Sequence, residues 1–178
     1  FFAGYSAGSS VSTAAYILAL GPYAGKCLGE HSIAMGWAGG YKQTGSHNMF
    51  IGANTACTTA GTGMYNVAVG MCALRDLEGR CNAAFGYASG RAITSGCGNT
   101  TLGFCAGVNI TSGNCNVAIG KCVTVASATG SCQLAIGVEG TYWLTGDSSF
   151  HIQPGAGIRD KDGDLGSSGQ VLSSTGTQ

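Results

Sequence analysis

The sequence predicts an all-β repeat protein: a β-solenoid or β-roll of about nine rungs, each 15–18 residues long. Three observations predict it. A glycine recurs at nearly constant spacing, apolar residues alternate with alanine just before it, and the composition is rich in glycine and poor in charge. Self-similarity at a fixed short period is the signature of stacked repeats.

The repeat is clearest in the segments "YNVAVGMCA" from Tyr65 and "CNVAIGKCV" from Cys115. Aligning all copies on their central glycine gives Gly4, Gly21, Gly36, Gly52, Gly70, Gly86, Gly103, Gly120 and Gly137. Each copy is too short to bury much apolar surface alone, so stability must come from stacked neighbours. At a strand spacing of about 4.8 Å, nine rungs would rise roughly 40 Å, which predicts a rod.

Each repeat predicts a short strand that ends at its glycine, for example over residues 67–69 and 117–119. The residue before the glycine and the residue two positions earlier are mostly apolar, and the residue between them is usually alanine. Alternation with a period of two is typical of a strand with one buried face. We therefore expect the large apolar residues to form the buried face. The small alanines would let another strand or chain approach the second face, so that both faces are covered.

A polar residue lies four positions before most of the glycines. The column is Ser32, Asn48, Asn66, Asn82, Asn99, Asn116 and Gln133. Stacked amides can hydrogen-bond to their equivalents one rung away, and asparagine is also a common turn residue in its own right. The column favours a ladder. Linkers such as "TSGNCN" and "QTGSHN" supply the turn into the next rung.

Composition excludes several classes of protein. There are 32 glycines and only 9% charged residues, against roughly 25% in an ordinary globular domain. Eight basic and eight acidic residues cancel without any run of like charge, so we expect neither nucleic acid nor an anionic membrane as a partner. The longest apolar stretch, at 14–20, is shorter than the roughly 20 residues of a membrane-spanning helix, so we expect no membrane insertion. The chain begins at Phe1 inside repeat-like sequence, so we expect it to be part of a longer or processed product.

The "N-V-A-I-G" unit resembles the head repeats of trimeric autotransporter adhesins, and more closely the longer repeats of bacteriophage tail-fibre and structural proteins. The resemblance covers about residues 1–140 and is best at 66–70 and 116–120. It implies a β-roll in each chain and a homotrimer packed around one axis, with the three chains either intertwined or side by side. The period here is a few residues longer than in the adhesin heads.

Residues 141–178 break the period and carry six of the sixteen charges. We interpret them as a terminal cap or connector that follows a repeat region at 1–140. The segment "GAGIRDKDGDLGSSGQVLSSTG" resembles sequences near repeats in phage structural proteins. Adhesins would instead continue into a coiled coil, and no apolar heptads occur here.

The resemblance implies a fibre segment on the surface of a phage virion, at the tail, with contact to a host-surface glycan. The alternative is a cell-surface trimeric adhesin or extracellular filament. A more remote alternative is an ice-binding solenoid, which would need a regular threonine ladder that the irregular threonines do not provide.

The nine cysteines occupy repeat columns. Cys72, Cys105 and Cys122 lie two residues after the glycine, and Cys81, Cys115 and Cys132 lie five before it. Cysteine can replace alanine or serine at a small buried position. Disulfides are the alternative, with Cys81–Cys97 and Cys115–Cys132 as candidate pairs one rung apart. The absence of a C-x-x-C pair argues against zinc.

No constellation for catalysis, cofactor binding or metal binding is recognisable, so we expect no enzyme. Asp160, Asp162 and Asp164 have the first spacing of a calcium loop, but Leu165 and Val171 stand where that loop needs Gly and Glu, which favours a solvated turn. The histidines are His31, His47 and His151, and they are scattered. We interpret them as exposed or hydrogen-bonded turn residues.

Aromatic residues follow several of the glycines, namely Tyr5, Tyr23, Trp37, Tyr87 and Phe104. On the side of a rod they could line a carbohydrate groove by stacking, or they could cap the apolar layer or fill a contact between subunits. Two N-glycosylation sequons begin at Asn99 and Asn109, which matter only in a glycosylating secretory pathway.

Overall fold

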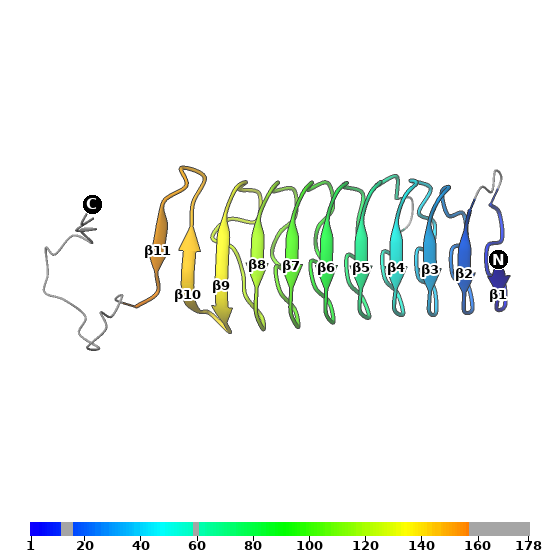
Figure 1. Cartoon of the computed structure of the whole chain (residues 1–178), viewed down its shortest axis with the longest axis horizontal. Coiled ribbons are helices and arrows are strands. Elements are labelled where there is room, and N and C mark those ends of the chain that lie inside the picture. Colours follow the sequence, from blue (N-terminus) through cyan, green and yellow to red (C-terminus); the bar gives the residue numbers. More distant parts are fainter. Residues whose placement is uncertain (12–15, 59–60, 157–178) are drawn as a thin grey trace, which may run out of the picture.

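The computed structural model describes residues 1–11, 16–58 and 61–156, and it confirms an all-β solenoid. Figure 1 shows an elongated stack of coils with one continuous sheet along its length. The strands are β1 (Phe2–Ala3), β2 (Leu18–Leu20), β3 (Ile33–Met35), β4 (Met49–Ile51), β5 (Val67–Val69), β6 (Ala83–Phe85), β7 (Thr100–Leu102), β8 (Val117–Ile119), β9 (Leu134–Val138), β10 (Thr141–Gly146) and β11 (Ile152–Pro154).

Strands β1 to β9 pair in parallel, each with the next in the chain, so the chain makes eight turns between them. The register places equivalent repeat positions side by side: Leu18 pairs with Ile33, and Val117 pairs with Leu134. Strands β1 to β8 each end directly before a repeat glycine, and β9 runs through Gly137. At Gly70 φ is +130°, and a Cβ there would lie 2.4 Å from the carbonyl oxygen of Gly86 on the next rung. Only glycine satisfies both conditions.

The structure places the opposite face of each strand in the core from the face that the sequence predicted. The central residues are fully buried inside the coil, as at Ala34, Ala68, Ala118 and the larger Phe50. The large apolar residues on either side of them point outward and remain partly exposed. The expectation that these large residues form the buried face was therefore wrong. In β2 to β9 one side chain per strand points into the narrow coil. It is usually alanine, with Phe50 and Thr101 as the exceptions. The return segments supply larger residues to the same core, such as Leu77, Ile93 and Ile110.

The polar column forms a hydrogen-bonded ladder in the buried corner of the coil, as predicted. Asn82 shows the pattern. Its backbone N–H and its Nδ2 donate to Asn66 Oδ1 at 2.9 and 3.2 Å, and its Nδ2 also donates to the carbonyl of Gly96 at 2.9 Å. Its own Oδ1 accepts from the backbone N–H and the Nδ2 of Asn99. Each amide thus satisfies backbone groups that the turn leaves unpaired.

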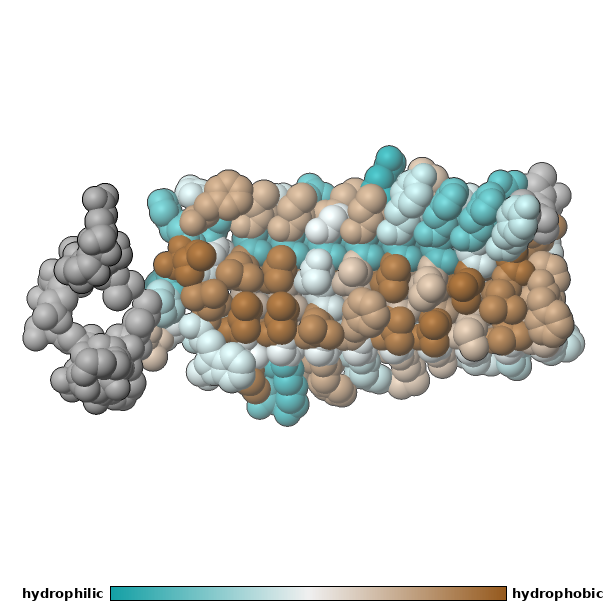
Figure 2. Space-filling model, viewed as in Figure 1, coloured by the Kyte–Doolittle hydropathy of each residue, from teal (hydrophilic) through white to brown (hydrophobic). Residues whose placement is uncertain are grey.

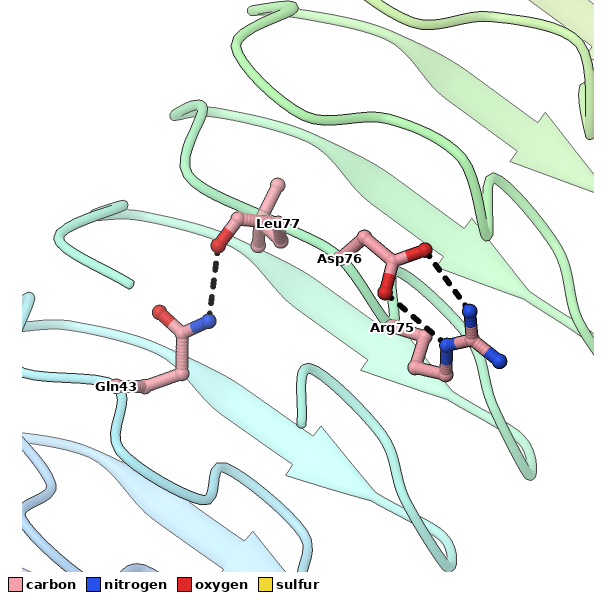
Figure 3. Close-up of polar contacts among 4 residues, drawn as sticks. All are labelled: Gln43, Arg75, Asp76 and Leu77. Atoms are coloured by element: carbon pink, nitrogen blue, oxygen red, sulfur yellow. Dashed lines mark hydrogen bonds and ion pairs between the residues drawn. The ribbon is translucent and has the colours of Figure 1, made fainter. Parts of the chain in front are cut away.

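The fourth rung is irregular, since its two glycines, Gly52 and Gly70, are 18 residues apart. Gln43 lies on the previous rung and is buried beside this irregular rung. Its Nε2 reaches across to the carbonyl of Leu77 at 2.9 Å, which Figure 3 shows. Its Oε1 accepts no hydrogen bond from the described residues. A side chain at Gly61 would collide with this amide.

The parallel stack ends at β9. There the chain turns at Glu139 and Gly140, so that β10 pairs antiparallel with β9 and β11 pairs antiparallel with β10. Tyr142 packs against the end of the apolar core, and its hydroxyl lies 2.8 Å from Thr124 Oγ1. The hairpin thus covers part of the last rung.

Candidate functional site

The first candidate surface is the outer face of the parallel sheet. It consists of the two outward residues of each strand from β2 to β9, and it is called here the apolar sheet face. Its members are Leu18, Leu20, Ile33, Met35, Met49, Ile51, Val67, Val69, Ala83, Phe85, Thr100, Leu102, Val117, Ile119, Leu134 and Ile136. Only Thr100 is polar. Figure 2 shows the face as a brown band along the rod.

The apolar sheet face is exposed along its whole length. Phe85 is 42% exposed and Leu102 is 47% exposed, and most of the other members are half-buried. Eight strands at about 4.8 Å spacing, each roughly 10 Å long, give a projected area of roughly 350 Å². Continuous apolar patches of this size on single chains commonly mark interaction sites.

The second candidate surface is a groove at the corner that follows strands β2 to β4. It has a volume of about 350 Å³ and is lined by Tyr23, Trp37, Ala38, Tyr41, Asn54 and Cys57. These residues come from three successive rungs. Trp37 is 52% exposed, so much of its ring is open to solvent. The structure therefore places two of the predicted aromatic residues, Tyr23 and Trp37, in one groove. This aromatic groove combines ring surfaces with one amide side chain, that of Asn54.

Cationic side chains border the aromatic groove. The ammonium nitrogens of Lys26 and Lys42 lie 5.6 and 5.4 Å from the centre of the Tyr41 ring, within the range of cation–π attraction. Lys26 and Tyr41 each lie five residues after a repeat glycine, so they occupy one column. The sequence interpretation missed Tyr41 and both lysines. Reading that column together with the aromatic one could have revealed Lys26 and Tyr41, and Lys42 follows Tyr41 directly.

The next rung contributes a paired charge. The guanidinium of Arg75 donates to both carboxylate oxygens of Asp76, at 3.0 and 3.1 Å (Figure 3). Burial raises the pKa of the Cys57 thiol, which therefore stays neutral near pH 7. Lys26 and Lys42 form no ion pair within the described part of the chain. Lys26 and Lys42 thus contribute positive charge at the border of the groove.

The other three predicted aromatic residues, Tyr5, Tyr87 and Phe104, do not line the aromatic groove. Tyr5 meets Tyr23 edge to face, with ring centres 5.3 Å apart. Tyr87 and Phe104 stack on each other further along the rod, at 5.0 Å. The ring faces of Tyr87 and Phe104 cover one another, so these two residues offer less open ring surface than Trp37 does.

A ladder of rings runs along the opposite corner, which precedes the strands. The rings of His31, His47 and Tyr65 stack one above another, with centres 4.9 and 5.0 Å apart. The ring of Tyr16 continues the row in a tilted orientation, with its centre 5.2 Å from that of His31. His31 and His47 are exposed turn residues, as expected. Because neighbouring rings cover each other's faces, this ladder presents mainly ring edges to solvent.

The cysteines lie mostly at the corners of the coil and not in its core. All nine are free, and none is buried. Seven have a positive φ, including Cys105, Cys115 and Cys132, and the left-handed turn directs their side chains outward. The interpretation of cysteine as a small buried residue was therefore wrong.

Neither disulfide candidate is formed. Cys115 and Cys132 are aligned on successive rungs, whereas Cys81 is aligned with Gly98, one residue beyond Cys97.

Within residues 1–11, 16–58 and 61–156, no group of three or more His, Cys, Asp or Glu side chains could hold a metal ion. Asp160, Asp162 and Asp164 lie outside these ranges. His151 is exposed and pairs with Asp147 at 3.2 Å. The described part of the chain contains no helix that is long and apolar enough to span a membrane.

Comparison with protein-family models, curated proteins and solved structures found no match.

Proposed function

We propose that the chain is a structural and adhesive segment of a phage virion fibre, in which three copies pack side by side through the apolar sheet face. The observation that carries the proposal is this face: fifteen of its sixteen outward residues are apolar, and none is charged. Covering it removes apolar surface from water, which is the main driving force of association.

A second copy of the chain is the partner that this surface fits best. The outward pairs repeat at the spacing of parallel strands, and another copy aligned with the rod presents the same pairs at the same spacing. A three-residue strand carries two outward columns, and around a threefold axis each column can contact a different neighbour. The threefold symmetry itself follows the resemblance to phage fibre and adhesin repeats.

The fibre role and the location at the virion surface also follow that resemblance. The stacked coils support it physically, since a rod of similar rungs spans distance with a short repeated sequence. In the described residues, no group of three or more His, Cys, Asp or Glu side chains could hold a metal ion. The aromatic groove lies on the side of the rod, at the corner that follows β2 to β4, and supplies the surface for contact with a host glycan.

The test is the mass of the purified chain by light scattering. We expect a particle three times the 17.7 kDa of one chain. Val69→Glu should convert it to single chains, because three carboxylates would meet in the apolar interface. The variant should keep its far-ultraviolet circular dichroism, since Val69 points away from the coil's own core.

Ser112→Glu is the matched control, because Ser112 is exposed in the linker between β7 and β8, outside the apolar sheet face. It should leave the mass unchanged. A wild-type chain that stays monomeric, or a Val69→Glu variant that remains a trimer, would overturn the proposed assembly.

A further inference from the structure

We propose that the aromatic groove binds an anionic sugar, a pyranose ring that carries a carboxylate, such as a uronic acid unit of a polysaccharide. The inference rests on the proposed adhesive function and deepens it by naming the class of ligand.

The walls of the groove suit a sugar ring. Trp37 offers a half-exposed indole face, and Tyr23 and Tyr41 supply two further rings across adjacent rungs. The apolar C–H face of a pyranose packs on such rings, and large amphipathic aromatics are the usual means of holding it. A volume of about 350 Å³ lies within the range of small-ligand pockets, which suits one or two sugar units.

The polar groups around the groove can orient a bound sugar through hydrogen bonds and attract its carboxylate. Asn54 lines the groove and is only partly buried, so its amide can both donate to and accept from sugar hydroxyls. Lys26 and Lys42 border the groove with ammonium groups that flexible stems can move toward a bound carboxylate. Asp76, whose charge acts on the Cys57 thiol of the groove, is paired with Arg75.

The other exposed aromatic arrays do not combine these features. The ladder of Tyr16, His31, His47 and Tyr65 and the pair of Tyr87 and Phe104 have their ring faces stacked on one another. Trp143 is 66% exposed on β10 but does not line the aromatic groove. Open ring surface, an amide and two cations therefore coincide at one place in the described structure.

The test uses two matched probes, a β-1,4-linked tetrasaccharide of glucuronate and the corresponding tetrasaccharide of glucose, with binding measured by calorimetry on the chain as purified. We expect the glucuronate probe to bind at least tenfold more tightly. The difference should shrink as salt rises from about 0.05 to 0.5 M, because salt screens the ammonium–carboxylate attraction.

Three variants locate the site. Trp37→Ala should weaken binding of the glucuronate probe at least tenfold. Trp143→Ala removes a more exposed ring elsewhere and should change binding less than twofold. The double variant Lys26→Gln, Lys42→Gln should abolish the preference for glucuronate over glucose and keep the fold.

Equal binding of both probes would overturn the anionic class of ligand. No binding, or equal loss in Trp37→Ala and Trp143→Ala, would overturn the site. Light scattering on the same samples keeps the two proposals apart, since a monomer that binds glucuronate at Trp37 would refute the trimer and support the groove.

Discussion

Replacing Asn82 by alanine tests the ladder that joins the rungs. The change removes the oxygen that accepts from the backbone N–H of Asn99 and the amide that donates to the carbonyl of Gly96. Neither group has another hydrogen-bond partner within the described residues. Asn82 and Asn99 are each only 1% exposed, so water cannot readily replace the lost amide.

The magnitude follows from these two orphaned groups. A buried polar group left without a partner costs about 1–3 kcal/mol, so the pair predicts a loss of about 2–6 kcal/mol. That is a large part of the roughly 5–15 kcal/mol by which domains are stable. In the variant, Asn66 Oδ1 loses the hydrogen bond from the Asn82 amide. It keeps the one from the backbone N–H of residue 82 only if that backbone stays in place.

The assay is urea unfolding followed by circular dichroism, at one protein concentration because assembly contributes to stability. Asn114→Ala is the matched control. Asn114 is exposed, and its Oδ1 accepts a single hydrogen bond, from the backbone N–H of Cys97 at 2.8 Å. We expect a loss below about 1 kcal/mol there. Hydrogen exchange of the Asn99 amide should also accelerate in Asn82→Ala. Equal destabilisation in the two variants would refute the view that the buried amides hold the rungs together.

Two further predictions concern the turns. Gly70→Ala should cost several kcal/mol of stability or prevent folding, because the new Cβ would lie 2.4 Å from the Gly86 carbonyl oxygen at a φ of +130°. In the control Gly140→Ala the new Cβ meets no atom within 4 Å, so the cost should be only about 1–2 kcal/mol for the left-handed φ. Similar melting temperatures for the two variants would contradict this. Burial, and then the neighbouring Cys122, raise the pKa of the Cys105 thiol, so less thiolate is present at a given pH and Cys105 should alkylate more slowly at pH 8 than a model thiol of ordinary pKa. Because the protonated form is favoured in the folded state, the stability it contributes is complete below the ordinary cysteine pKa of about 8.5 and is lost as pH rises through the higher folded value. Peptide mapping of the alkylated chain measures the rate, and a Cys105 rate equal to that of the model thiol would contradict the raised pKa.

The sequence alone determined the solenoid, because its evidence is local and repeated. Each rung needs a glycine where the chain turns at positive φ against the next rung, as at Gly70, and an amide where backbone groups are left unpaired, as at Asn82. These requirements recur once per turn, so they appear in the sequence as columns. The nine predicted rungs correspond to strands β1 to β9, whereas the antiparallel β10 and β11 lie where the period breaks.

The tertiary structure alone decided which side of each strand is the core. Alternation says that two faces differ, but not which one is inside. The narrow coil accepts the small Ala68 and excludes the larger Val67 and Val69 because the return segment already fills the space with residues such as Leu77. The structure likewise decided the aromatic groove, since Trp37, Tyr41 and Asn54 converge only when successive corners stack. Periodicity fixes which residues share a column, whereas the volume enclosed by the coil fixes which columns face water.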